Sequence, residues 1–312
     1  MKNTVAGRKI NRYMIGTWGW GTGTNGAKIV FGKNYPESQL RETFDAAFSK
    51  GFDLWDTAEV YGNGTSERLL GNIIKNKDVM ISTKHFPGRR YSSGENRIAL
   101  KNSLERLGRD KADIYWLHSP VNLEENMKEL AGLYKEGLIG MIGLSNGNTE
   151  QIRLSEVILK ENGASLGAVQ NHYSLLAMER EAPALEYCLS HNILFFGYML
   201  LEQGALSGHY DANNHFPLLS VRGMSFGKSK FAKIQPLIDY IRSLGAKYSI
   251  DPSQIPIAWA VSKRVIPIIG LTKPSHAEAL AKGTEITLRP HEIKQLETLA
   301  LESGVKCKGF WE

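Results

Sequence analysis

The chain has 312 residues, of which 42% are hydrophobic, so it can form one large α/β barrel or two ordinary domains around a sizeable core. Its formal net charge of +6 is spread along the chain and is not interleaved with aromatic residues, which argues against a nucleic-acid partner. The two cysteines, Cys188 and Cys307, form no metal-ligand spacing, and no signal peptide or membrane-spanning run is recognisable, so we expect a cytoplasmic protein with neither metal nor membrane partner.

Short apolar strands alternate with amphipathic helices along the chain. The expected strands cover residues 13–18, 52–56, 79–84, 113–118, 139–145, 167–170, 193–198 and 265–270. The expected helices cover residues 37–48, 66–75 (with Ser66 as its cap), 97–107, 124–136, 149–160, 183–190, 231–248, 253–263, 275–281 and 291–302. Eight such units predict an α/β fold, a (β/α)8 TIM barrel, as a single domain over residues 1–312. We expect an N-terminal extension and long loops at the C-terminal face.

The loop after the first strand contains Gly21-Thr-Gly23-Thr-Asn-Gly26, formally the glycine pattern of a dinucleotide-binding turn. That turn requires a helix to begin immediately afterwards. The first clear helical pattern begins only near Glu37, so residues 19–32 are interpreted as a flexible loop.

Polar residues stand where strands end, and in a TIM barrel these ends meet at one mouth. The second strand ends at Asp56 with Tyr61 in its loop, the third at Lys84 and the fourth at His118. Taken alone, Asp56 could equally cap a turn and Tyr61 could simply pack. Together, an ammonium about 4 Å from a phenol whose pKa is about 10 would lower that pKa by up to about three units, so Lys84 is expected to activate Tyr61 as a proton donor. Asp56 would hold Lys84, His118 would orient a substrate oxygen, and a nicotinamide cofactor would supply hydride.

These segments resemble the aldo-keto reductase family. Asp56-Thr-Ala-Glu-Val-Tyr61-Gly-Asn-Gly-Thr-Ser-Glu67 is similar to its best-known signature, and Ser82-Thr-Lys84 and Trp116-Leu-His118 are similar to the segments that carry its lysine and histidine. The resemblance runs from about Met14 to Glu302. It implies a TIM barrel that binds NADPH across the strand ends and reduces an aldehyde or ketone, with Tyr61 as proton donor.

The resemblance also implies which residues bind the cofactor. Ser145, Asn146 and Gln170 match the groups that hold the nicotinamide carboxamide, and Tyr198 matches the residue on which the ring stacks. Gly204-Ala-Leu206-Ser-Gly208 resembles the segment over the pyrophosphate, and Met199 and Leu201 are further expected cofactor-binding residues. Gly270, Thr272, Lys273 and His276 match the stretch that meets the 2′-phosphate, where a lysine and a hydroxyl favour NADPH over NADH.

Two places depart from the family pattern. Ala279-Leu280 replaces a Glu-Asn pair that contacts adenine in many relatives, and Met199-Leu200 replaces Ser-Pro. Two or three lost polar contacts at about 1 kcal/mol each would weaken cofactor binding roughly ten- to hundredfold, unless Leu280 faces the core. Candidates for an aromatic substrate pocket are Trp18, Trp20, Phe86, Tyr91, Phe310 and Trp311, and candidates to meet an anionic substrate are Arg89, Arg90 and Arg222. Residues 202–230 are expected to close over the cofactor.

The leading functional hypothesis is NADPH-dependent reduction of a small-molecule carbonyl compound. An alcohol or sugar dehydrogenase, or transient redox within an elimination or isomerisation, stays open because the sequence does not fix the direction. A nicotinamide-binding regulatory subunit with little turnover is the third alternative, although the complete set of four catalytic positions argues against it. Neither the particular substrate nor the oligomeric state can be read from the sequence.

Overall fold

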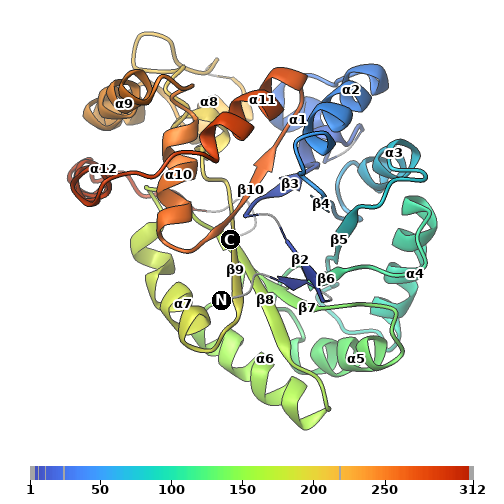
Figure 1. The fold of residues 1–312 in the computed structure, drawn as a ribbon. Coiled ribbons are helices and arrows are strands. Elements are labelled where there is room, and N and C mark those ends of the chain that lie inside the picture. The colour runs from blue at the N-terminus through green and yellow to red at the C-terminus, as the bar shows by residue number, and fades with distance from the viewer. Residues whose placement is uncertain (1–3, 6, 11, 24, 218, 309–312) are drawn as a thin grey trace.

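Eight parallel strands close into a barrel that is surrounded by helices (Figure 1). The computed structural model of the protein describes residues 4–5, 7–10, 12–23, 25–217 and 219–308. In order around the barrel, the strands are β10 (Ile266–Gly270), β3 (Met14–Gly16), β4 (Leu54–Asp56), β5 (Met80–His85), β6 (Ile114–Leu117), β7 (Ile142–Ser145), β8 (Leu166–His172) and β9 (Leu194–Tyr198). The TIM barrel expected from the sequence is confirmed.

Each barrel strand is followed by at least one helix, which carries the chain back so that the next strand runs parallel to the last. The long helices are α2 (Glu37–Phe48), α3 (Thr65–Ile73), α4 (Glu95–Leu107), α5 (Leu123–Lys135), α6 (Thr149–Glu161), α7 (Met178–Ser190), α9 (Lys228–Tyr248), α10 (Gln254–Ser262), α11 (Pro274–Gly283) and α12 (Pro290–Glu302). Within the described ranges, none of the helices has both the length and the apolar character needed to cross a membrane.

The loop after β3 is more structured than the sequence indicated. It contains a 3₁₀ turn, η1 (Trp18–Trp20), and a one-turn helix, α1 (Ala27–Phe31), that begins directly after Gly26. The expectation that no helix follows this glycine pattern is therefore wrong. Five residues are too few to show helical periodicity, and so short a helix depends on its tertiary contacts.

Ser66 does not cap α3, contrary to expectation. The helix begins at Thr65, and the Ser66 hydroxyl instead donates to the Thr17 carbonyl oxygen at 2.9 Å and accepts from the Thr57 hydroxyl at 3.1 Å. Thr17 follows β3 and Thr57 follows β4, so Ser66 ties the start of α3 to the ends of two strands.

The N-terminal extension forms a small hairpin of β1 (Thr4–Val5) and β2 (Arg8–Lys9), which pair antiparallel. Val5 and Ile10 belong to the same buried cluster as the barrel-interior residues Met14 and Leu54. In Figure 1 the hairpin strand β2 lies over the centre of the barrel. The hairpin therefore closes the end of the barrel at which the strands begin.

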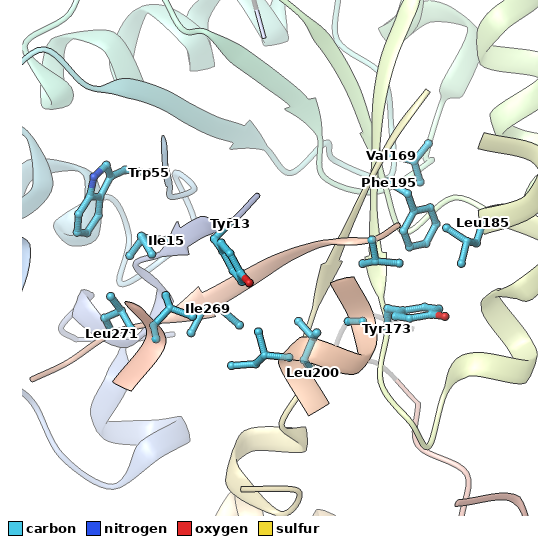
Figure 2. Packing of buried hydrophobic residues seen from close by; sticks show 14 of the residues in the cluster. Tyr13, Ile15, Trp55, Val169, Tyr173, Leu185, Phe195, Leu200, Ile269 and Leu271 are labelled. Atoms are coloured by element: carbon cyan, nitrogen blue, oxygen red, sulfur yellow. The ribbon is translucent and has the colours of Figure 1, made fainter. Parts of the chain in front are cut away.

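Two apolar layers follow from the alternation of side chains along each strand. In β4, Leu54 belongs to the cluster inside the barrel and Trp55 to the cluster between strands and helices. Figure 2 shows part of that outer layer, with Ile15 near Trp55 and, in another part of the view, Phe195 near Val169 and Leu185. The inner layer fills the barrel beneath its mouth.

Candidate active site

The side chains at the mouth continue the inward rows of the strands. Leu54, Met80 and Ile114 face the barrel interior, so positions that lie an even number of residues later on the same strands also face inward. The inward-facing positions at the carboxyl end are Asp56, Ser82, Lys84, Trp116 and His118. Strand alternation therefore explains why three of the four candidate catalytic residues meet.

A buried ion pair forms the floor of the mouth. Lys84 is fully buried and its Nζ donates to Asp56 Oδ2 at 2.5 Å and to the Thr57 carbonyl oxygen at 2.7 Å. The Ser82 hydroxyl donates to Asp56 Oδ1 at 2.6 Å and accepts from the Trp116 indole at 2.6 Å. A buried pair is tolerated only when such hydrogen bonds satisfy its remaining atoms. Ser82 belongs to the Ser82-Thr-Lys84 segment, but the sequence did not predict that it would be a partner of Asp56.

Tyr61 and His118 lie directly above this pair. The Lys84 ammonium is 5.2 Å from the centroid of the Tyr61 ring, and the Tyr61 and His118 ring centroids are 6.0 Å apart. Both side chains are buried, and Phe86 packs edge-on against His118 at 5.5 Å. The four candidate catalytic residues therefore form one cluster, with the phenol and the imidazole towards the cavity.

The expected lowering of the Tyr61 pKa is wrong for the protein alone. Burial raises the pKa of Tyr61 well above its usual range, and the Asp56 carboxylate raises it further, with a smaller contribution from Tyr198. Lys84 lies over the ring face and is already paired with Asp56, so its charge does not overcome these effects. Burial also lowers the pKa of His118, and the positive charges of Lys84 and His85 lower it further. At neutral pH the cluster therefore holds a protonated phenol and a neutral imidazole.

A cavity of about 330 Å³ opens above the cluster. The sequence-predicted residues in its lining are Trp18, Asp56, Tyr61, His118, Ser145, Asn146, Gln170, Tyr198, Met199, Leu201, Gly204, Gly270, Thr272 and His276. Lining residues that the sequence reasoning missed are Gly16, Gly19, Phe31, Tyr35, Gln203, Ile268 and Ile269. Phe31 ends helix α1, and Tyr35 follows it. Because the sequence did not predict α1, neither residue was expected in the cavity lining.

Several expected contacts lie elsewhere. Leu206 is fully buried in the outer core, and Lys273 is exposed before α11 and does not line the cavity. Leu280 is fully buried in the same outer core, which confirms that its side chain faces the core. The Arg222 guanidinium lies 4.5 Å over the Phe216 ring and donates to the Gln203 carbonyl oxygen at 3.4 Å, so it supports the loop after β9.

The proposed aromatic wall is only partly present. Trp18 lines the cavity, and Phe86 contacts His118. Trp20 is buried against Trp55 and donates to the Leu271 carbonyl oxygen, whereas the Tyr91 hydroxyl points to Glu129. Arg89 and Arg90 are exposed and do not line the cavity, and Phe310 and Trp311 lie outside the described residues.

The lining fits a nicotinamide cofactor. Ser145, Asn146 and Gln170 present the hydroxyl and amide groups that a carboxamide can pair with, and the Tyr198 ring offers an aromatic face. The cavity continues to Thr272, which lies just before the N-terminus of α11, and the positive end of the helix dipole there favours phosphate. The described residues contain no cluster of histidine, cysteine or carboxylate side chains that could hold a metal ion.

Comparison with known proteins identifies the family. The model of the aldo/keto reductase family matches residues 13–300, nearly the whole barrel, and the class it describes is an NAD(P)H-dependent oxidoreductase. The chain belongs to the aldo/keto reductase family.

The sequences of several named relatives align with most of the chain. It is 30% identical to the chloroplastic pyridoxal reductase of Arabidopsis thaliana, over 93% of this chain and 83% of the relative. It is 26% identical to the aldo-keto reductase yakc [NADP(+)] of Schizosaccharomyces pombe, over 94% of this chain and 91% of the relative. The structure resembles that of the glycerol dehydrogenase AKR11B4 from Gluconobacter oxydans, with a TM-score of 0.80, 25% identity, and coverage of 96% and 94% of the two chains.

Proposed function

We propose that this protein uses NADPH to reduce an aldehyde or ketone to an alcohol, with Tyr61 as the proton donor. The observation that carries the proposal is the position of a protonated, buried phenol and a neutral imidazole at the cavity floor, above the Lys84–Asp56 ion pair. The name of the Arabidopsis relative, a pyridoxal reductase, supports carbonyl reduction. The name of the fission-yeast relative supports NADP(H).

The reaction adds a hydride to the carbonyl carbon and a proton to its oxygen. When bound, the nicotinamide supplies the hydride. The Tyr61 O–H bond breaks as the alcohol O–H bond forms, and the phenolate then regains a proton from solvent. Because Lys84 lies over the Tyr61 ring, its ammonium stabilises the developing phenolate. Asp56 opposes the lowering of the Lys84 pKa by burial, and thereby keeps the lysine charged.

His118 orients the carbonyl oxygen in this proposal. A neutral imidazole can donate one hydrogen bond without competing with Tyr61 as an acid. The Asn146 side-chain amide donates to the His118 carbonyl oxygen at 2.9 Å, which fixes the backbone that carries the ring. The imidazole and the phenol can therefore approach the same oxygen from two sides.

For the cofactor, Ser145, Asn146 and Gln170 would hold the carboxamide, and Tyr198 would stack on the ring. Met199, Leu201, Gly204 and Gly270 would form the cavity wall beside it, with Leu206 contributing only through the packing beneath. Thr272, Lys273 and His276, at the start of α11, would meet the 2′-phosphate, which favours NADPH over NADH.

A small uncharged aldehyde is the substrate class that the lining favours. Trp18, Phe31 and Tyr35 give the cavity aromatic walls, and no lysine or arginine is among its described lining residues. Pyridoxal, named for the Arabidopsis relative, belongs to this class. Oxidation of an alcohol is the second candidate, because the glycerol dehydrogenase has a similar fold and the chemistry is reversible.

A cofactor titration and a substrate panel test the proposal. Nicotinamide fluorescence measured with NADPH and NADH should give tighter binding for NADPH. Loss of nicotinamide absorbance should then accompany reduction of pyridoxal or benzaldehyde, with glycerol and NADP⁺ as the reverse assay. If neither NADPH nor NADH bound at about 100 μM, well above the affinities usual for such cofactors, the proposed function would be wrong.

A further inference from the structure

The turn after β9 has an unusual backbone. Met199, Glu202 and Gln203 have φ angles of 61°, 46° and 55°, and Gly204 has 108°. Residues other than glycine adopt this left-handed backbone conformation at a cost in free energy. The conformation persists only where surrounding contacts hold it. Something must therefore fix this turn.

Glu202 is the residue in residues 199–204 that faces away from the cavity. The lining includes Met199, Leu200, Leu201, Gln203 and Gly204, but not Glu202. Glu202 is only 5% exposed, and its carboxylate contacts His172 at the end of β8 and Ser174 just after it. One oxygen, Oε1, accepts from the His172 ring at 2.7 Å and from the Ser174 hydroxyl.

The hydrogen-bond roles of the two His172 ring nitrogens follow from their neighbours. Arg180 Nη2 lies 3.3 Å from His172 Nδ1, and a guanidinium can only donate, so Nδ1 must accept. Nε2 then carries the proton and donates to Glu202. Arg180 itself donates to the Cys307 carbonyl oxygen at 3.0 Å and pairs with Glu181 at 2.8 Å. The imidazole is therefore fixed on both sides.

Contacts lead from this anchor to the catalytic cluster. The His172 ring stacks on Tyr198, with centroids 5.7 Å apart and planes at 24°. The Tyr198 hydroxyl donates to Asn146 Oδ1 at 2.7 Å, and the Asn146 amide donates to the His118 carbonyl oxygen. Glu202 is thus linked through His172 to the Tyr198 ring, on which we expect the nicotinamide to stack.

We propose that Glu202 is a positioning residue whose buried carboxylate, through His172 and Ser174, holds residues 199–204 in the conformation that forms the cofactor side of the cavity. This inference rests on the function proposed above, because it takes that cavity as the cofactor site. It assigns Glu202 no contact with substrate or cofactor.

Three variants test the anchor. Glu202→Leu removes the hydrogen bonds from His172 and Ser174 and the contact with the Cys307 thiol. Glu202→Gln keeps an oxygen that can accept from His172 and Ser174, and Ser174→Ala removes the bond from Ser174 alone. We expect the Kd for NADPH to rise at least about tenfold in Glu202→Leu, and about threefold in Ser174→Ala, with Glu202→Gln within about twofold of wild type. The KM for NADPH should rise more than kcat falls at saturating cofactor. Ser174→Ala also keeps the test decisive if Glu202→Leu does not fold.

Glu292→Leu is the matched control. Glu292 is equally buried and accepts from Tyr248 at 2.6 Å and from Lys247, but it joins α12 to α9 away from the cavity. Loss of the Glu292 carboxylate should lower the free energy of unfolding and leave the Kd for NADPH unchanged. If Glu292→Leu weakened NADPH binding as much as Glu202→Leu, the effect would be general destabilisation and the proposal would be wrong.

Amide hydrogen exchange of residues 199–206 provides a readout without cofactor. Exchange should be faster in Glu202→Leu than in wild type, and unchanged in Glu202→Gln. Wild-type exchange and wild-type Kd in a folded Glu202→Leu variant would overturn the proposal. If wild type bound neither NADPH nor NADH while exchange behaved as expected, the proposed function would fail and the anchor alone would stand.

Discussion

Lys84 shows how one buried charge depends on its neighbours. Its ammonium has no exposed surface, and desolvation lowers its pKa, yet Asp56 at 2.5 Å and the Thr57 carbonyl keep the charged form favourable. Tyr61 benefits from this charge only as its proton leaves, because in the resting state burial and Asp56 keep its pKa high. The proposed proton transfer therefore depends on Lys84 and Asp56 as a pair.

Lys84→Met should abolish carbonyl reduction and destabilise the protein. Removal of the ammonium leaves Asp56 buried without its partner, which costs about 3 to 5 kcal/mol in the free energy of unfolding. The double variant Lys84→Met with Asp56→Asn should recover much of that stability, measured by urea unfolding, and remain inactive. Equal stability of the single and double variants would show that the pair is not coupled.

His85, the last residue of β5, provides a testable titration. Its Nδ1 lies 2.6 Å from Glu59, which also accepts from the Phe86 backbone at 2.9 Å. Burial lowers the pKa of His85, but the hydrogen bond and charge of Glu59, with Glu95 and Glu129, outweigh burial and raise it above 6.5. The folded protein therefore holds this proton more tightly than the unfolded chain.

The contribution of the protonated His85 to the free energy of unfolding is fully present below pH 6.5. It is lost as the pH rises through the pKa of His85 in the folded protein. His85→Asn keeps a donor for Glu59 but does not titrate. The difference in the free energy of unfolding between wild type and His85→Asn should be largest near about pH 5.5 and shrink by about pH 8.5. A difference that stayed constant over this range would rule out the raised pKa.

At the scale of elements, alternation along the strands places the inward-facing part of the site. The same parity that puts Met80 inside the barrel puts Lys84 at its mouth, so the sequence could predict that position. Helix α1 could not be predicted, because five residues carry no periodic pattern. Nor could the link from Glu202 to His172, because it joins the loop after β9 to β8 through side chains whose direction depends on the folded turn.

β7 packs closely against the Trp116 indole inside the barrel. A Cβ on Gly143 would lie 2.1 Å from Trp116 Cε3. Gly143→Ala should therefore displace the indole and its hydrogen bond to Ser82, with a loss of about 1 to 3 kcal/mol in the free energy of unfolding and lower kcat. The matched control is Gly132→Ala in α5, where no atom lies within 4 Å, and thermal unfolding should show equal or higher stability there. Equal effects of the two substitutions would contradict this account of the barrel interior.

At the scale of the whole molecule, barrel closure brings distant segments to one mouth. β3 and β10 pair with each other, and α1 contacts the short helix α8 (Val221–Ser225) in the loop after β9, so segments from the beginning and the end of the barrel sequence lie side by side (Figure 1). Eight strand–helix units were enough to predict this topology. The pKa of Tyr61 was not predictable, because it depends on burial and on where Lys84 lies relative to the ring, and neither appears in the order of residues.

Turnover of Tyr61→Phe tests the central claim most directly. The substitution removes the hydroxyl and keeps the ring that lies beside Lys84 and His118. With NADPH and an aldehyde that wild type reduces, kcat should fall by at least about 100-fold, as expected for loss of a positioned proton donor. The Kd for NADPH should stay within about threefold of wild type, because the cofactor residues are untouched. Wild-type kcat in Tyr61→Phe would show that another group donates the proton.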